Sequence, residues 1–229
     1  MNPDVFKNIR NKVLSYTHVD HPQLEDALRF YEVITLEKGE RLISEGNPVD
    51  YFYYLDSGCI SYYKMEEGEL KVLEFYTQDV FFTDLIAYVK GTPSDCYLEA
   101  LEPSVVFAVR KDRAEKSFEA SHQLERFGRL SMQEAFLKLF HRVDRTNNKS
   151  NEERYLRILQ KRPDLLQRVP QYLIASYLGI TPVGLSKLRK RLGKGRQNSS
   201  SSVKPARQRR VQTQTQIQTQ VQVTKLLPQ

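Results

Sequence analysis

The 229-residue sequence has no tryptophan and only two cysteines, Cys59 and Cys96. Two cysteines cannot form a disulfide scaffold, a four-cysteine zinc site or a cysteine-ligated iron–sulfur cluster. No run of about 18 apolar residues occurs, which argues against a transmembrane helix and a membrane partner. The first twenty residues also lack an apolar core of signal-peptide length. We therefore expect a cytoplasmic protein whose thiols are buried and structural.

Enzyme motifs are missing as well. The sequence contains no P-loop, no G-x-S-x-G or H-E-x-x-H motif, and no dinucleotide fingerprint after a predicted strand. Carboxylates such as Asp79, Asp84 and the pair Glu66-Glu67 have no acid/base partner at a patterned spacing. We expect a protein that is not an enzyme and that carries no cofactor.

Acidic residues are absent from the C-terminal end of the chain. From Lys187 onward there are eleven basic residues and no Asp or Glu, while the whole chain has a net charge of +7. Residues 1–186 hold the other 24 basic residues and all 28 acidic ones, a net charge of −4. A basic end on a mildly acidic body favours a polyanionic partner. The alternative is a solvated basic tail that binds nothing.

The first half of the chain changes from helical to β-type patterning at residue 31. Residues 1–30 carry apolar residues at helical spacing, with a break predicted at His21-Pro22. Short β-rich runs then alternate with glycine-containing turns up to residue 110, and crossover helices are missing. This pattern predicts an antiparallel barrel, roll or sandwich and not a parallel α/β domain. The runs are YEVITL, RLIS, YFYYLD, CISYYKM, LKVLEFY, VFFTDLIAYV, CYLEAL and VVFAV.

After Lys111 the apolar spacing is helical in one long stretch, followed by a polar segment over 146–151 that predicts a hinge. The helix has apolar residues on two faces and needs two covering surfaces. One is the roll; the other is either more of the same chain or the same helix of a second copy. We expect the second copy, and therefore a homodimer held by Phe127, Leu130, Met132, Phe136, Leu139 and Val143.

The segment QYLIASYLGITPVGLSKLRK, residues 171–190, has the pattern of a helix-turn-helix. Ala175 is the small residue where the helices cross, and Gly179 is the glycine of the turn. Thr181 and Pro182 predict the N-cap and first position of the second helix. The residues predicted to face inward from both helices are Ile174, Leu178, Ile180, Leu185 and Leu188.

The outward face of this second helix is basic, as a recognition helix in a DNA major groove requires. We expect Ser186 and Lys187 to contact bases, and the cations further along to meet phosphates. Gly184 weakens the helix by roughly 1 kcal/mol relative to alanine. A helical hairpin with a solvated face, or an RNA-binding or scaffolding protein, are the alternatives. The predicted DNA-contacting residues are Thr181, Pro182, Val183, Ser186, Lys187, Arg189, Lys190 and Arg191.

The glycine-punctuated β region, the long helix beginning LERFGRL, the hinge and the helix-turn-helix resemble the Crp/Fnr family of bacterial transcription regulators over about residues 5–192. The resemblance implies an α+β fold in three parts. These are a cyclic-nucleotide-binding-like β-roll sensor domain (1–122), a dimerisation helix (123–146) and a helix-turn-helix domain (147–195). The basic, serine- and glutamine-rich composition of residues 196–229 predicts a low-complexity, disordered tail. The resemblance also implies a homodimer that binds a palindromic operator in double-stranded DNA, with RNA polymerase as a further partner.

The predicted ligand pocket departs from the family pattern. Members that bind cyclic AMP carry Gly-Glu-Leu and then Arg-Ser in a phosphate cassette, but Phe82 and Thr83 stand at the first site here, or Thr83 and Asp84. Pro93 or Ser94 stands where the arginine belongs, followed by Asp95, which would repel a phosphate. We do not expect cyclic AMP or GMP to bind, although a cyclic-nucleotide-responsive regulator stays an alternative. The residues of this degenerate pocket are Phe82, Thr83, Asp84, Leu85, Ser94, Asp95 and Cys96.

Overall fold

The computed structural model describes residues 5–148 and 150–200, with side chains described for 5–140 and 150–192. Two helices, α1 (Lys7–Tyr16) and α2 (His21–Leu28), precede the strands. Among the described residues, no helix is long and apolar enough to span a membrane. The strands are β1 (Tyr31–Leu36), β2 (Arg41–Ile43), β3 (Tyr51–Ser57), β4 (Cys59–Glu66), β5 (Glu69–Thr77), β6 (Val80–Phe82), β7 (Tyr97–Ala100) and β8 (Ser104–Arg110).

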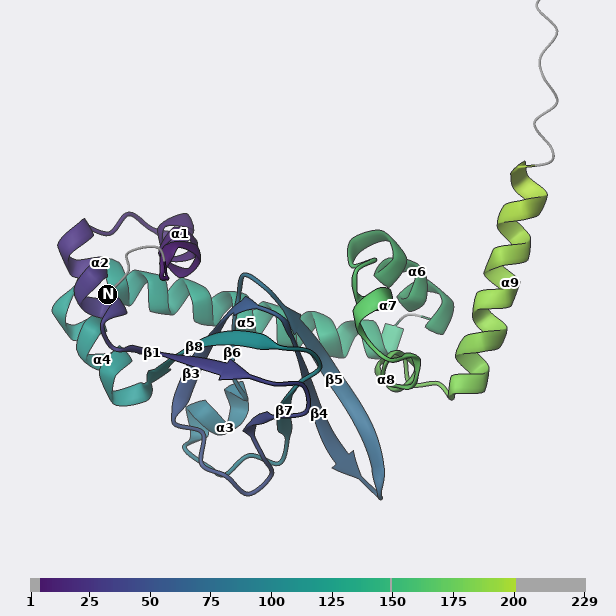
Figure 1. Cartoon of the computed structure of the whole chain (residues 1–229), viewed down its shortest axis with the longest axis horizontal. Coiled ribbons are helices and arrows are strands. Elements are labelled where there is room, and N and C mark those ends of the chain that lie inside the picture. Colours follow the sequence, from purple (N-terminus) through teal and green to yellow (C-terminus); the bar gives the residue numbers. More distant parts are fainter. Residues whose placement is uncertain (1–4, 149, 201–229) are drawn as a thin grey trace, which may run out of the picture. The chain divides into compact units, whose positions relative to one another are not determined.

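The strands form two four-stranded antiparallel sheets, which confirms the antiparallel fold predicted from the turn spacing (Figure 1). The strand order is β1-β8-β3-β6 in the first sheet and β2-β7-β4-β5 in the second. Side chains alternate along each strand. Tyr53 and Leu55 of β3 therefore enter the cluster between the sheets, while Tyr54 joins a second cluster on the outer face of the first sheet.

Helices cover that outer face. Phe6, which precedes α1, and Ile9 and Val13 of α1 recur at helical spacing. They pack with α2 against Tyr54 and Phe107 of the sheet. The outer cluster also receives side chains from the long helix α5 (His122–Asn148), which follows α4 (Lys111–Ala120). The roll is thus packed on both faces of its first sheet.

Three elements differ from the predicted pattern. Pro22 does not end a helix but sits in the first turn of α2, where its missing N–H is not needed. The run VFFTDLIAYV is divided into β6 and the helix α3 (Leu85–Lys90), because Asp84 caps α3. The long helical stretch after Lys111 is broken at Ser121, which is extended and whose hydroxyl accepts a hydrogen bond from the Leu124 N–H.

The polar stretch over residues 146–151, predicted as a hinge, contains the end of α5 and the start of the next helix. Helix α5 continues to Asn148, and Ser150 caps the next helix in a reciprocal capping box with Glu153. Residue 149 lies outside the described residues. The remaining helices are α6 (Asn151–Lys161), α7 (Leu165–Arg168), α8 (Gln171–Tyr177) and α9 (Pro182–Ser200).

Helix α9 is longer than the predicted span of 182–192, because it continues to Ser200. No proline, which would interrupt a helix, occurs between Pro182 and Pro205. Residues 196–200, placed in the predicted tail, are thus helical, and the rest of that tail, 201–229, lies outside the described residues. Residues up to Leu188 belong to one compact unit. The four predicted domain boundaries stay predictions.

Candidate functional site

The residues of the predicted ligand pocket lie together where β6 leads into α3. Phe82, Thr83 and Asp84 are buried, as are Ser94 and Cys96 on the segment that leads into β7. Leu85 is half-buried and Asp95 is exposed. The structure therefore brings most of the predicted set to one place. Phe82, Thr83 and Leu85 also line a pocket of about 450 Å³.

Asp84 is the centre of this group, and its carboxylate is held by the protein itself. Its Oδ2 accepts a hydrogen bond of 2.7 Å from the Ser94 hydroxyl, and its Oδ1 accepts one of 3.1 Å from the Tyr62 hydroxyl. The same carboxylate caps α3 by accepting from the Ala87 N–H. A buried carboxylate with these partners is stabilised without any ligand.

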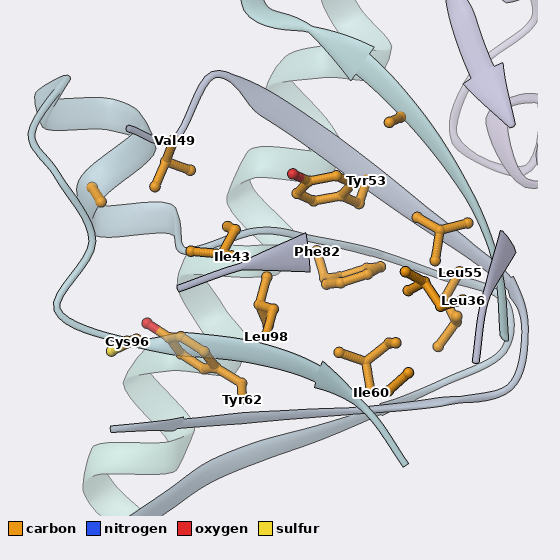
Figure 2. Close-up of a cluster of buried hydrophobic side chains, with 14 residues drawn as sticks. Leu36, Ile43, Val49, Tyr53, Leu55, Ile60, Tyr62, Phe82, Cys96 and Leu98 are labelled. Carbon is orange, nitrogen blue, oxygen red and sulfur yellow. The ribbon is translucent and has the colours of Figure 1, made fainter. Parts of the chain in front are cut away.

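Tyr62 is a member of this group that sequence reasoning missed. It stands on β4, opposite Leu98 in the antiparallel register, and no local motif connects it with Asp84. Figure 2 shows Tyr53, Phe82 and Leu98 across the interior of the roll, with Tyr62 and Cys96 together at one end. Burial raises the pKa of the Tyr62 hydroxyl above its usual range, and raises that of the Cys96 thiol to about 12. Both groups are therefore protonated at neutral pH.

The two cysteines are free and buried, as the sequence predicted. Cys59 begins β4, and burial raises the pKa of its thiol to about 11. Thiols with such pKa values form little thiolate at neutral pH and are poor nucleophiles. This chemistry fits structural side chains.

The long helix α5 is covered along its first half by its own chain. Phe127 is only 6% exposed, with its ring 5.2 Å from that of Phe81 and 5.7 Å from that of Tyr16. Phe127 therefore belongs to the core of one chain, where the prediction placed it on the dimer face. Leu130, Met132 and Leu139 are half-buried.

The second half of α5 has large apolar side chains on its surface. Phe136 and Phe140 are each 60% exposed, and Leu137 between them is 52% exposed. Exposed aromatic residues one helical turn apart form an apolar strip that contrasts with the covered first half. The side chain of Val143, also predicted on this face, lies outside the described ones.

Helices α8 and α9 are joined by a turn with the predicted geometry. Gly179 has a φ of 66°, in the left-handed region that favours glycine. The Thr181 side chain accepts a hydrogen bond of 3.1 Å from the Gly184 N–H, and Pro182 is the first residue of α9, so the predicted cap is confirmed. Ala175 is fully buried. Of the predicted inward set, Ile174, Leu178, Leu185 and Leu188 are buried and Ile180 is half-buried.

The predicted outward residues of α9 are exposed. Val183 is 64% exposed, and Thr181, Pro182 and Ser186 are also on the surface. The Ser186 hydroxyl donates 3.1 Å back to the Pro182 carbonyl, so it is engaged within its own helix. The basic residues of this exposed face, which we call the basic face of α9, are Lys187, Arg189, Lys190 and Arg191.

Comparison with known proteins gives one family match and many similar folds. Residues 33–121 match the family model described as the cyclic nucleotide-binding domain. The roll of this chain therefore has the cyclic nucleotide-binding fold. The global regulator CLP of Xanthomonas campestris, described as c-di-GMP responsive, is 18% identical, covers 77% of this chain and 93% of its own, and has a TM-score of 0.61.

Two further solved structures share the fold. FixK2 of Bradyrhizobium japonicum is 19% identical with a TM-score of 0.61 over 72% of this chain and 85% of its own. The sensor domain of the transcriptional regulator DNR of Pseudomonas aeruginosa is 21% identical, with a TM-score of 0.50 over 62% of this chain and 92% of its own. A comparison with curated proteins gives no match. At these identities the similarity establishes the fold.

Within the matched domain, two carboxylates and a thiol of the predicted pocket lie close together. Oxygen atoms of Asp84 and Asp95 and the sulfur of Cys96 lie within 4.8 Å of one another, and none of the seven predicted pocket residues is a cation. A phosphate at this position would meet two carboxylates instead of an arginine. The three side chains could approach a cation together, but Asp84 already accepts hydrogen bonds from Tyr62 and Ser94.

Proposed function

We propose that this chain is a sequence-specific DNA-binding transcriptional regulator of the Crp/Fnr type, which acts as a homodimer on an inverted-repeat operator. The observation that carries the proposal is the basic face of α9. Its four cations, Lys187, Arg189, Lys190 and Arg191, are all exposed, while Leu185 and Leu188 of the same helix are buried. A helix anchored on one side and cationic on the other suits a DNA major groove.

The first turns of α9 would read the bases. Lys187 lies within two turns of the helix start, where a recognition helix approaches base edges, and Val183 offers apolar contact to a thymine methyl. Arg189, Lys190 and Arg191 stand further along and would contact phosphates, which position the protein without selecting a sequence. Thr181 and Pro182 fix where the helix begins.

The proposed dimer rests on the second half of α5. Phe136, Leu137 and Phe140 are each more than half exposed. An apolar strip of this kind is covered when two copies of the helix pack together. Two copies would present two recognition helices to successive major grooves about 34 Å apart, so half-sites should be one helical turn apart.

The filled interior of the roll supports a regulator that does not take a cyclic nucleotide there. Tyr62 and Phe82 occupy the space between the sheets, and Asp84 and Asp95 place negative charge at the predicted phosphate position. Titration calorimetry with cyclic AMP and cyclic GMP should give no binding tighter than about millimolar, or −4.1 kcal/mol. Micromolar binding of either nucleotide would support the cyclic-nucleotide-responsive alternative instead.

Selection from a random duplex library tests DNA recognition directly. The full chain should enrich an inverted repeat, and Lys187→Ala should cost about 1–3 kcal/mol and relax one position of the site. Lys190→Ala is the matched control, because it removes an equal charge one turn away. It should weaken all sequences alike and reduce the salt slope by about one.

The outcomes separate the candidate functions. An inverted repeat with distinct effects of the two lysine variants supports base reading by α9. If no repeat is enriched and the two variants behave alike, base recognition by this helix is wrong. Tighter binding to structured RNA than to duplex DNA would favour an RNA-binding protein, and binding to neither would favour a scaffolding role.

A further inference from the structure

Apart from the predicted nucleotide pocket, a cavity lies outside the roll, beneath the helices that cover the first sheet. Its volume is about 270 Å³, and its walls come from α1, α2, α3, α4 and α5 and from the outer face of β1, β3 and β8. These elements are visible together around α1, α2 and α4 in Figure 1. Apolar side chains make most of the lining, including Val13, Leu28, Phe52, Val109 and Met132. The cavity shares none of the seven residues of the predicted nucleotide pocket.

Three hydrogen-bond donors line this otherwise apolar cavity. Within the described residues, the hydroxyls of Tyr31 and Tyr88 make no hydrogen bond, although Tyr31 packs against the outer core cluster. The Lys111 ammonium donates 3.1 Å to the Tyr88 carbonyl oxygen and lies 5.1 Å from the centre of the Tyr88 ring. An ammonium has three donors, so Lys111 has capacity beyond this bond.

The other hydroxyls of the lining are already engaged. Ser117 donates to the Arg113 carbonyl at 3.1 Å and Ser131 to the Gly128 carbonyl at 3.0 Å, each within its own helix. Burial raises the pKa of the Tyr31 hydroxyl above its usual range and, with the nearby Glu115 carboxylate, raises that of Tyr88 to about 12. Both tyrosines are therefore donors at neutral pH. The lining thus offers two phenolic donors and one cation to an acceptor.

We propose that this cavity binds a small aliphatic monocarboxylic acid, with its hydrocarbon chain between the helices and its carboxylate on Tyr31, Tyr88 and Lys111. A carboxylate has only acceptor atoms and matches this set of donors. Glu115 also lines the cavity but is exposed, so its charge is solvated at the rim. The volume is about nine times the roughly 30 Å³ share of one water molecule, which suits a ligand of about ten heavy atoms.

Octanoate, with ten heavy atoms, is the probe, and 1-octanol and octylammonium are the matched probes with a neutral and a positive head. Titration calorimetry on the full chain should show that octanoate binds and that the other two bind more weakly. Lys111→Met and Tyr31→Phe should each weaken octanoate about tenfold, the effect of removing a hydrogen bond to a charged group. Lys116→Met, on the exposed side of α4, and Tyr172→Phe, exposed on α8, are the controls and should leave octanoate affinity unchanged.

A filling variant locates the ligand. Ala114 lines the cavity and is buried, so Ala114→Leu should abolish binding of octanoate while circular dichroism shows a folded chain. If that variant does not fold, nuclear Overhauser effects between octanoate and the Met132 methyl of the wild-type chain decide the site. No octanoate binding below its micelle concentration, full binding in folded Ala114→Leu, or no such Overhauser effects would overturn the proposal. Equal affinity for 1-octanol, unchanged by Lys111→Met, would overturn the carboxylate assignment.

Discussion

The interior of the roll and the outward faces of α5 and α9 use similar residues in opposite ways. Inside the roll, Phe82 is 3% exposed and the Asp84 carboxylate accepts hydrogen bonds from Tyr62 and Ser94. On α5, Phe136 is 60% exposed, and on α9 the basic face is exposed. The roll holds these side chains in internal contacts, while the helices carry side chains that are available to partners.

The cavity under α1, α2 and α4 lies between these extremes. Its lining is mostly apolar, and the hydroxyls of Tyr31 and Tyr88 have no hydrogen bond within the described residues. In the roll interior, a comparable hydroxyl, that of Tyr62, is paired with Asp84. The two phenol hydroxyls and the Lys111 ammonium beside apolar walls make this cavity a candidate ligand site.

The largest expected effect is the loss of stability when a phenylalanine is truncated inside the roll. Phe82→Ala should lower the free energy of unfolding by about 3–5 kcal/mol, because the removed ring leaves a cavity between the sheets. Val89→Ala is the control at an exposed apolar site outside the proposed dimer strip and should change it by less than about 0.5 kcal/mol. Urea unfolding measures both. Similar losses of unfolding free energy for the two variants would contradict the contrast between the roll interior and the exposed helix surfaces.

A smaller effect is expected on association when the apolar strip of α5 is disrupted. Phe136→Asp should weaken the proposed dimer by about 2 kcal/mol or more, because it places a carboxylate in an apolar contact while the chain itself stays folded. Size-exclusion chromatography with light scattering reports the mass. Val89→Asp, a substitution of an equally exposed apolar residue on α3, should leave the mass unchanged. A wild-type chain that is monomeric at micromolar concentration would end the dimer proposal.

The strands and the α8–α9 turn could be predicted because their signals are local. Each β-rich run has a glycine or proline near at least one end, and Gly179, Thr181 and Pro182 each have one conformational role in the turn. The buried positions Ala175 and Leu185 also followed from helical spacing. These features depend on residues a few positions apart.

The parts that could not be predicted depend on distant contacts or on competition between patterns. Tyr62 and Asp84 meet through strand pairing across 22 positions, which no local motif encodes. In VFFTDLIAYV, β-branched and aromatic residues favoured a strand, but the Asp84 side chain stabilises a helix from Leu85. Phe127 was placed on the dimer face because helical spacing does not tell which neighbour covers a stripe.

The smallest expected effect concerns a polar contact on the helices themselves. The Arg10 guanidinium donates to Glu25 at 2.7 Å and holds the pKa of that carboxyl below its usual range. A carboxyl with a lowered folded-state pKa adds stability above its unfolded pKa and loses it as the pH falls through the folded value. The Glu25 side chain is 31% exposed, so the pair is worth only about 0.5 kcal/mol. Glu25→Gln should therefore lower the free energy of unfolding by that amount at pH 7, and the loss should shrink as the pH falls through the folded-state pKa of the wild-type carboxyl, towards pH 2. Urea unfolding at both pH values gives the difference, with Asp26→Gln, an exposed neighbour, as the control. A loss at pH 7 as large as that of Phe82→Ala would show that surface polar contacts rival the roll interior in stabilising the fold.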